Sequence, residues 1–210
     1  MNHGQKKKDI EPLHIALLLI FLVTLLWSVI HPKDLFTWFL EVLPALIGLA
    51  AILITYNRFR LTNLVYVLIL IQAIILVIGG HYTYAEMPFF NWLRDTFHLA
   101  RNHYDRLGHF VQGFVPAMIS REILLRKSPL KNGKLLSFLV ISICLAISAS
   151  YELIEWGVAA ATGSAADAFL GTQGDVWDTQ WDMLLALCGS IISLLTLQKF
   201  HNSVLKQRQH

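Results

Sequence analysis

The chain has 210 residues, of which 55% are hydrophobic and 15% are charged, and its mean hydropathy is +0.54. A soluble domain usually carries about 25% charged residues, so a water-soluble globular protein is excluded. The net charge is only +3, and no basic stripe with interleaved aromatic residues indicates a nucleic-acid partner. Composition therefore predicts an all-α polytopic membrane protein, folded as a single helical domain over residues 1–210, with the lipid bilayer as its partner.

The N-terminal stretch begins like a signal peptide, because basic residues at 6–8 precede an apolar run. That run continues to Ile30, however, and residues 31–34 (HPKD) follow where a small-residue cleavage site would be expected. We therefore expect an uncleaved first membrane helix.

About six apolar runs approach the roughly 20 residues that cross a hydrocarbon core. The expected membrane helices are 13–30, 35–56, 61–80, 105–125, 135–156 and 176–197. Between the third and fourth, the stretch 88–99 places Phe89, Leu93 and Phe97 four residues apart, which is typical of an amphipathic helix in the membrane interface. An ordinary connecting helix that packs on the bundle fits the same pattern. The stretch 157–174, rich in Ala, Gly, Ser and Thr, is expected to be a loop.

Charge predicts the orientation of the helices. Thirteen of the 17 Lys and Arg residues lie in the N-terminal stretch, in two turns at 57–60 and 121–134, and in the tail. The other four lie on the opposite side of the predicted helices: Lys33, Arg94, Arg101 and Arg106. The positive-inside rule then predicts that both termini are cytoplasmic. Eleven of the 14 acidic residues show the reverse bias and lie near the outer ends of helices.

Polar residues enter the apolar pattern at one level on three of these helices. They are Asp105, Arg106, His109, Glu152, Glu155, Asp178 and Asp182. The fourth and sixth helices begin on the outer side and the fifth ends there, and residues three or four apart share a helix face. We therefore predict that these side chains meet in one polar site at the periplasmic face, with Arg106 as the charge partner.

Simpler explanations exist for individual members of this site. Asp105 and Asp178 each fit an acid in the first turn after a helix N-cap, where it also complements the helix dipole. A single His such as His109 is more often a packing residue than a ligand. Glu152 and Glu155 fit no such explanation, because they oppose the dipole at a helix C-terminus and repel each other. Something must neutralise them: a cation, an Arg, His109 or bound protons.

Several kinds of chemistry fit these residues. Carboxylates with one imidazole suit a divalent ion such as Mg²⁺, Mn²⁺ or Zn²⁺. The candidate metal ligands are His109, Glu152, Glu155, Asp178 and Asp182. A bound metal would activate water for hydrolysis of, or transfer from, a lipid or envelope substrate. Without a metal, His109 and Glu155 are candidates for a catalytic acid–base pair.

Three functional classes stay open from the residues alone. The first is a site for a cation or for a polar lipid or envelope-derived ligand, with or without enzymatic chemistry. The second is a small transporter or proton-coupled binding protein that uses the same residues. The third is a structural charge cluster that holds the last three helices together. Oligomeric state is not indicated by the sequence.

Three motifs carry a resemblance to a known family. YDRLGHF at 104–110, the E-x-x-E pair of YELIEW and GDVWDTQWDMLLALCGS together resemble the YjdF family of bacterial inner membrane proteins over nearly the whole chain. That resemblance implies a multi-pass protein of the bacterial inner membrane and supplies no activity. A more distant similarity is to VanZ-like membrane proteins, which have a Gln and an Asn where this chain has Glu155 and Asp182. The two replacements each add a carboxylate and favour a cation or a proton.

Overall fold

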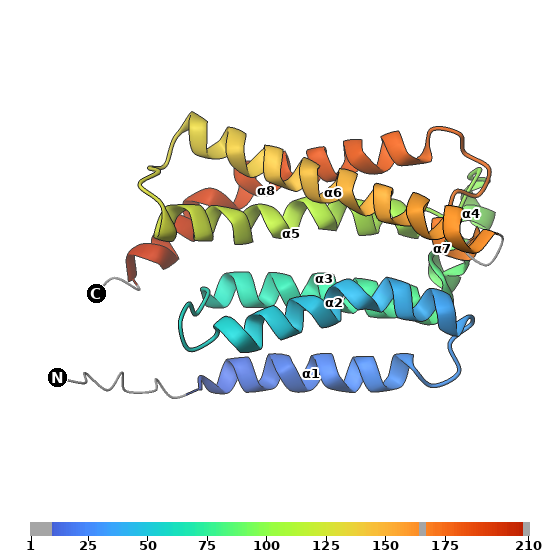
Figure 1. Ribbon diagram of the computed structural model, residues 1–210, viewed down its shortest axis with the longest axis horizontal. Helices are drawn as coiled ribbons and strands as arrows, with labels where there is room; N and C mark the ends of the chain where they lie inside the picture. Colours follow the sequence, from blue (N-terminus) through green and yellow to red (C-terminus); the bar gives the residue numbers. More distant parts are fainter. Residues whose placement is uncertain (1–9, 164–166, 208–210) are drawn as a thin grey trace.

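The computed structural model describes residues 10–163 and 167–207, and every regular element in these ranges is helical. Six long helices run side by side (Figure 1): α1 (Pro12–Ser28), α2 (Leu35–Thr55), α3 (Asn63–Tyr82), α5 (Tyr104–Lys127), α6 (Lys134–Thr162) and α8 (Asp178–Gln207). Three short elements lie at one end of this bundle: η1 (Tyr84–Glu86), α4 (Pro88–Phe97) and α7 (Asp167–Leu170). The all-α polytopic class is confirmed.

Helix boundaries differ from the prediction mainly near the chain's C-terminal half. The predicted loop 157–174 is wrong in part, because α6 continues to Thr162 and a short helix forms at 167–170; residues 164–166 lie outside the described ranges. The last helix continues past its predicted end to Gln207, because its buried face extends to His201. The elements at 84–86 and 167–170 were not predicted.

Four helices in the described ranges are long and apolar enough to cross a membrane by length and composition: α2, α3, α6 and α8. The apolar α1 is shorter, at 17 residues, and α5 is too polar to qualify. The polar composition of α5 is explained by its packing, because α5 carries more buried residues than any other long helix described. A helix surrounded by other helices does not need an apolar surface toward lipid. The six-span count stays a prediction.

Two glycines explain how closely α5 and α8 pack. A Cβ at Gly113 would collide with the backbone carbonyl of Ala186, and a Cβ at Gly189 would collide with that of Phe110. Small residues at a helix interface let two backbones approach. The Gly113–Ala186 contact lies one turn away from His109 on α5 and from Asp182 on α8, so it brings these two side chains to the same level.

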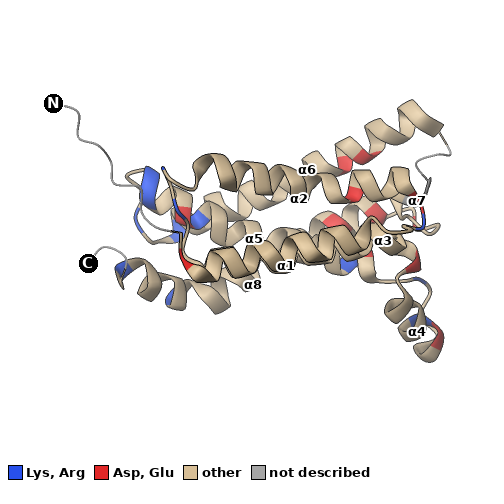
Figure 2. Ribbon diagram, turned by 90° about the horizontal axis from the view of Figure 1, so that it is seen from below, with Lys and Arg blue, Asp and Glu red and all other residues tan. Residues whose placement is uncertain are grey.

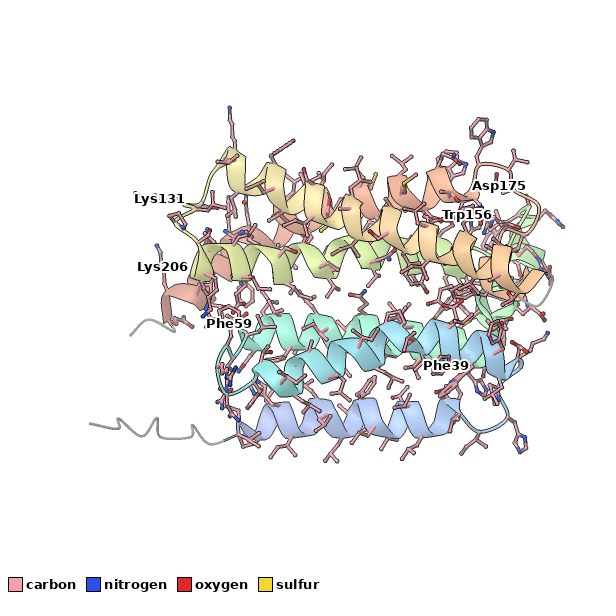
Figure 3. All side chains as sticks on the ribbon, in the orientation of Figure 1. Phe39, Phe59, Lys131, Trp156, Asp175 and Lys206 are labelled. Atoms are coloured by element: carbon pink, nitrogen blue, oxygen red, sulfur yellow. The ribbon has the colours of Figure 1, made fainter. Side chains whose placement is uncertain are left out.

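Charged side chains separate along the bundle axis. Lys and Arg gather at the end where α1 begins and α8 ends, whereas most Asp and Glu lie toward the opposite end (Figure 2). Figure 3 shows the same division, with Lys131 and Lys206 at one end and Asp175 at the other. We call these the basic end and the acidic end. The charge asymmetry expected from the sequence is therefore present in the fold.

At the basic end, a buried polar cluster joins α3, α5 and α8. The fully buried carboxylate of Glu122 accepts hydrogen bonds from the backbone and hydroxyl of Thr62 at 3.0 and 2.7 Å. It also accepts from Arg126 at 2.5 Å and from His201 Nε2 at 3.1 Å. Arg121 donates to His201 Nδ1 at 2.8 Å, so this nitrogen carries no proton and Nε2 is the donor. Thr62 is the residue immediately before α3, so its hydrogen bonds to Glu122 fix the start of that helix on α5.

At the acidic end, α4 presents its aromatic residues outward. Phe89, Trp92 and Phe97 are all more than half exposed, and α4 has no buried residue. This favours the interfacial helix over one that packs on the bundle, because an amphipathic helix places such a face in the lipid boundary. Its position in a membrane interface stays a prediction.

Candidate functional site

The site is built around the first two turns of α5. Asp105 and His109 share one face of that helix and are both buried, with 7% and 4% exposure. Asp105 Oδ1 lies 3.5 Å from His109 Nε2. The α5–α8 contact adds Asp182, which is equally buried. One potential ligand atom from each of Asp105, His109 and Asp182 lies within 4.8 Å of the other two.

Glu152 on α6 reaches the same imidazole from the other side. Its Oε1 lies 3.7 Å from His109 Nδ1, which is close enough for an ion pair but too long for a hydrogen bond. His109 Nδ1, Glu152 Oε1 and Asp182 Oδ1 are all buried and lack a hydrogen-bond partner among the described residues. Buried polar atoms in folded proteins are nearly always satisfied, so each of these orphaned atoms requires an explanation.

Glu155 lies at the edge of this group. It is buried at 9% exposure and lies within electrostatic reach of Glu152, Asp105 and Asp182. It does not join the three-residue cluster that brings potential ligand atoms together. The structure thus places Glu155 beside the site rather than among its closest ligand atoms.

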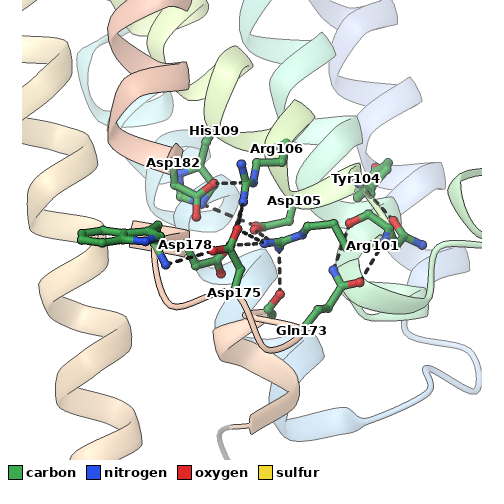
Figure 4. Close-up of polar contacts among 12 residues, drawn as sticks. Arg101, Tyr104, Asp105, Arg106, His109, Gln173, Asp175, Asp178 and Asp182 are labelled. Carbon is green, nitrogen blue, oxygen red and sulfur yellow. Dashed lines mark hydrogen bonds and ion pairs between the residues drawn. The ribbon is translucent and has the colours of Figure 1, made fainter. Parts of the chain in front are cut away.

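Arg101 is the most buried cation at the acidic end. Its guanidinium pairs closely with Asp178, lies 3.5 Å from Asp105 Oδ2 and donates to the carbonyl oxygen of Gly171 at 3.0 Å (Figure 4). The sequence prediction named Arg106 as the charge partner and considered Arg101 only as one of several groups that could neutralise Glu152 and Glu155. Arg101 lies before the first turn of α5, although it is four residues from Asp105.

Arg106 contacts three carboxylates at the acidic end. Its NH2 group donates to Asp175 at 2.8 Å and to Asp178 at 3.3 Å, and its Nε lies 3.6 Å from Asp182 Oδ1. The guanidinium carbon also lies 5.5 Å from the centroid of the Trp181 ring. Arg106 therefore joins the start of α5 to the start of α8.

Asn102 fixes the segment that carries these two arginines. Its side chain donates to the carbonyl of Met87 at 3.0 Å and to Asn91 Oδ1 at 2.8 Å, which ties it to α4. Its backbone exchanges two hydrogen bonds, both of 2.9 Å, with the amide of Gln173. Asn102 Oδ1 also accepts from the backbone N–H of Tyr104 at 3.0 Å. The segment before α5 is thus held both by α4 and by the connection between α7 and α8.

The capping explanation does not account for Asp105 and Asp178. Asn102 and Asp175 accept backbone N–H groups near the starts of α5 and α8, at 3.0 and 2.9 Å. The carboxylates of Asp105 and Asp178 instead face the guanidinium of Arg101. Their positions in a first helical turn still complement the dipole.

Two groups at the rim of the site respond to its charges. The backbone N–H of Trp177 and the guanidinium of Arg106 lower the pKa of Asp175 below its usual value. Partial burial and the guanidiniums of Arg101 and Arg106 lower the pKa of His103 below its usual value. Asp175 is therefore ionised and His103 neutral at pH 7. The rim adds one negative charge and no positive charge to the site.

Sequence reasoning missed two further buried groups. Glu41 on α2 has 3% exposure and lies within electrostatic reach of Asp105 and His109. Tyr84 of η1 is also buried, and its hydroxyl has no hydrogen-bond partner among the described residues. A single acid inside an apolar membrane helix is itself a signal for function, and it could have included Glu41 in the site.

The charge balance of this region is strongly negative. Seven carboxylates surround it: Glu41, Asp105, Glu152, Glu155, Asp175, Asp178 and Asp182. Arg101, Arg106 and His109 are the basic side chains that the described contacts place among them. Buried charges in a membrane protein are normally paired, so this surplus of carboxylates requires compensation beyond these three basic side chains.

Comparisons with known proteins bear on family rather than on chemistry. Residues 13–203 match the model of a family described as "Predicted membrane protein (DUF2238)". The chain is also 49% identical over 177 residues to "Inner membrane protein YjdF" of Escherichia coli (strain K12), which covers 84% of this chain and 85% of that protein. No solved structure matches the chain. The YjdF resemblance is confirmed and supports an inner-membrane location, whereas these matches give no support to the VanZ-like similarity.

Proposed function

The chain belongs to the DUF2238 family of membrane proteins, and we propose that it binds a divalent cation at the acidic end of its helix bundle. Asp105, His109 and Asp182 would supply the ligands. The observation that carries the proposal is the convergence of three buried ligand atoms within 4.8 Å of one another, with orphaned atoms on His109 and Asp182.

The distances within this group support a shared ion. Asp105 Oδ1 lies 3.5 Å from His109 Nε2 and Glu152 Oε1 lies 3.7 Å from His109 Nδ1, so neither carboxylate hydrogen-bonds to the imidazole directly. An ion bound to one ring nitrogen would have only one of these two carboxylates as a further ligand. Ligand atoms that lie about 2.0–2.2 Å from one Zn²⁺ are separated from each other by distances of this order. A ligand set of one imidazole and several carboxylates suits Zn²⁺ or Mn²⁺ better than Ca²⁺, which prefers oxygen alone.

A purely structural cluster explains only part of the arrangement. Arg101 and Arg106 account for Asp175 and Asp178, because these four groups form close ion pairs. Glu152 and Glu155 have no such guanidinium partner among the described contacts. A proton-coupled transporter is the second candidate, and the buried Glu41 and Glu155 favour it, because bound protons would also neutralise surplus carboxylates.

The site would also face the periplasm. The Lys and Arg residues gather at the opposite end of the bundle, and the positive-inside rule assigns that end to the cytoplasm. A metal there would lower the pKa of a bound water and could serve hydrolysis of a polar lipid or envelope-derived ligand. Glu155, which lies within electrostatic reach of the group, would be the candidate to accept the proton of that water.

Elemental analysis of purified protein tests the cation. We expect the wild-type protein to retain a stoichiometric divalent metal after dialysis, and Asp182→Asn and His109→Gln to lose it. Glu86→Gln is the matched control, because Glu86 is an acid at the same end that pairs with Lys33 at the surface.

The same variants distinguish the alternatives. Wild-type protein without metal, together with a lower melting temperature for Asp182→Asn, would refute the cation and favour the structural cluster. Wild-type protein without metal and with unchanged stability in the variants would instead favour protons. Retention of metal by Asp182→Asn and His109→Gln would show that the metal binds elsewhere.

A further inference from the structure

A cavity of about 190 Å³ lies far from the polar site, between α1 and α2. Both helices pack against α3, which forms the floor of the cavity, while α1 and α2 form its walls. Leu17, Phe21 and Leu49 are among the wall residues, and Ile69, Leu70 and Ala73 belong to the floor. We call this cavity the α1–α2 groove. It occupies the half of these helices that lies toward the basic end.

Polar bridges hold α1 in place near both ends of the groove. Toward the basic end, His14 Nδ1 lies 2.5 Å from the hydroxyl of Tyr56, and His14 Nε2 lies 3.0 Å from Asn63 Oδ1. Toward the acidic end, Trp38 Nε1 donates to Ser28 Oγ at 3.0 Å. Because α1 is fixed on both sides, the groove cannot close through a simple shift of this helix.

The walls select an apolar occupant. An engineered apolar cavity of about 150 Å³ stays dry and takes up benzene or xenon, because water finds no polar partners there. The α1–α2 groove is larger, and the two imidazole nitrogens of His14 that border it are already engaged. Ile15 of α1 and Leu53 of α2 line the groove and are about half exposed, so it is open along its side. In a membrane that side faces acyl chains.

The charges at the basic end indicate the head group. Arg60 lies beside the groove, with its guanidinium carbon 4.3 Å from the centroid of the Tyr56 ring. Its NH1 also lies 3.7 Å from Glu11 Oε1. Arg58 is exposed next to it in the same turn. Basic residues next to a membrane helix attract anionic lipid head groups.

We infer that the α1–α2 groove holds one acyl chain of an anionic phospholipid, whose head group lies beside the exposed Arg58. The lipid comes from the leaflet at the basic end. This site is independent of the proposed cation site, because the two share no residue. A bound chain fills a space that α1 and α2 leave over α3, and it thereby completes the packing of α1.

Photolabelling with a phosphatidylglycerol that carries a diazirine in its acyl chain tests the inference. We expect labelling of wild-type protein in mixed phospholipid vesicles to concentrate on groove residues. Ala73→Leu adds three carbon atoms to the groove floor and should reduce this labelling about tenfold, which corresponds to about 1.4 kcal/mol of binding. Ala50→Leu is the matched control, because it adds the same atoms on an exposed position of α2.

Each labelling outcome supports or refutes the groove as a lipid site. Equal labelling of wild type and Ala73→Leu, or labelling spread evenly over exposed positions, would refute the groove as a lipid site. A crosslink between two copies of the chain through groove residues would assign it to a second copy and also refute the inference. If Ala73→Leu fails to fold, Arg58→Gln supplies the test. We expect that variant to label with phosphatidylglycerol no better than with phosphatidylcholine, and an unchanged preference would refute the head-group assignment.

Discussion

Two carboxylates that lie at opposite ends of α5 and its partners have different surroundings. Glu122 at the basic end receives hydrogen bonds from Thr62, Arg126 and His201. Asp182 at the acidic end is almost as buried, yet its Oδ1 has no hydrogen-bond partner among the described residues. A fully satisfied buried charge is typical of a structural anchor, whereas an unsatisfied one is typical of a binding site.

The anchor role of Glu122 leads to a stability prediction. Glu122→Ala leaves the donors of Thr62, Arg126 and His201 without their acceptor in a buried region. Removing one partner of a buried ion pair typically costs about 3–5 kcal/mol. We expect a large fall in the melting temperature of the purified protein in detergent, measured by circular dichroism.

Glu86→Ala is the control for Glu122→Ala. Glu86 also forms an ion pair, with Lys33, but both side chains are about half exposed. Exposed pairs contribute about 0–1 kcal/mol, so this variant should melt close to the wild type. Similar melting temperatures for the two variants would contradict the anchor role of Glu122.

How far the site could be predicted depends on the spacing of its residues. Asp105 with His109, and Asp178 with Asp182, are four residues apart, and helical periodicity alone was enough to place each pair on one face. Arg101 lies four residues before Asp105 but outside the helix, and Glu41 lies on α2, so only the packing of these segments against α5 brings them to the site. The sequence therefore predicted the site residues on α5 and α8 better than the contributions of Arg101 and Glu41.

At the level of elements, the apolar helices were predictable and the ends of the polar ones were not. The predicted 35–56 and the observed Leu35–Thr55 nearly coincide, because lipid-facing residues mark α2 along its whole length. α8 extends beyond its predicted end because its buried face continues to His201, in turns that are too polar to be counted as a membrane span. Hydropathy measures contact with lipid, so it does not detect a helix that continues beyond the lipid.

The α5–α8 contact is the element on which the position of Asp182 depends. Gly189→Val would place its side chain against the backbone of Phe110, and a backbone cannot move aside as a side chain can. Overpacking a tight interface costs about 1–3 kcal/mol. We expect a lower melting temperature together with weaker retention of the metal, since Asp182 would move away from His109.

Gly157→Ala is the control for this contact. Gly157 is also helical, but nothing lies within 4 Å of a Cβ built on it. Replacing a helical glycine by alanine in open space should stabilise the protein by about 0.5–1 kcal/mol. A metal content that stays unchanged in Gly189→Val would show that the α5–α8 contact does not position the site.

For the whole molecule, charge and architecture agree. α1 begins and α8 ends at the basic end, so the bundle has both of these helix ends on one side (Figures 1 and 2). An even number of crossings produces this arrangement, and the sequence predicted six. The polarity of the bundle across the membrane follows only from the positive-inside rule.

Reporter fusions test that polarity directly. A reporter fused after His210 should behave as cytoplasmic, and so should one inserted in the turn around Lys131 between α5 and α6. A reporter inserted near Gly174, between α7 and α8, should behave as periplasmic. Both kinds of reporter, one active only in the cytoplasm and one active only in the periplasm, should be used at each position, because a silent fusion is otherwise uninformative.

The outcome also decides where both proposed sites act. If the three fusions behave as expected, the polar site faces the periplasm and the lipid of the α1–α2 groove comes from the cytoplasmic leaflet. If all three are inverted, the cation site would open to the cytoplasm, although its ligands would be unchanged, because the packing of α5 against α8 does not depend on orientation. Fusions after His210 and at Lys131 on opposite sides would contradict the bundle itself, since α8 and α5 both end at the basic end.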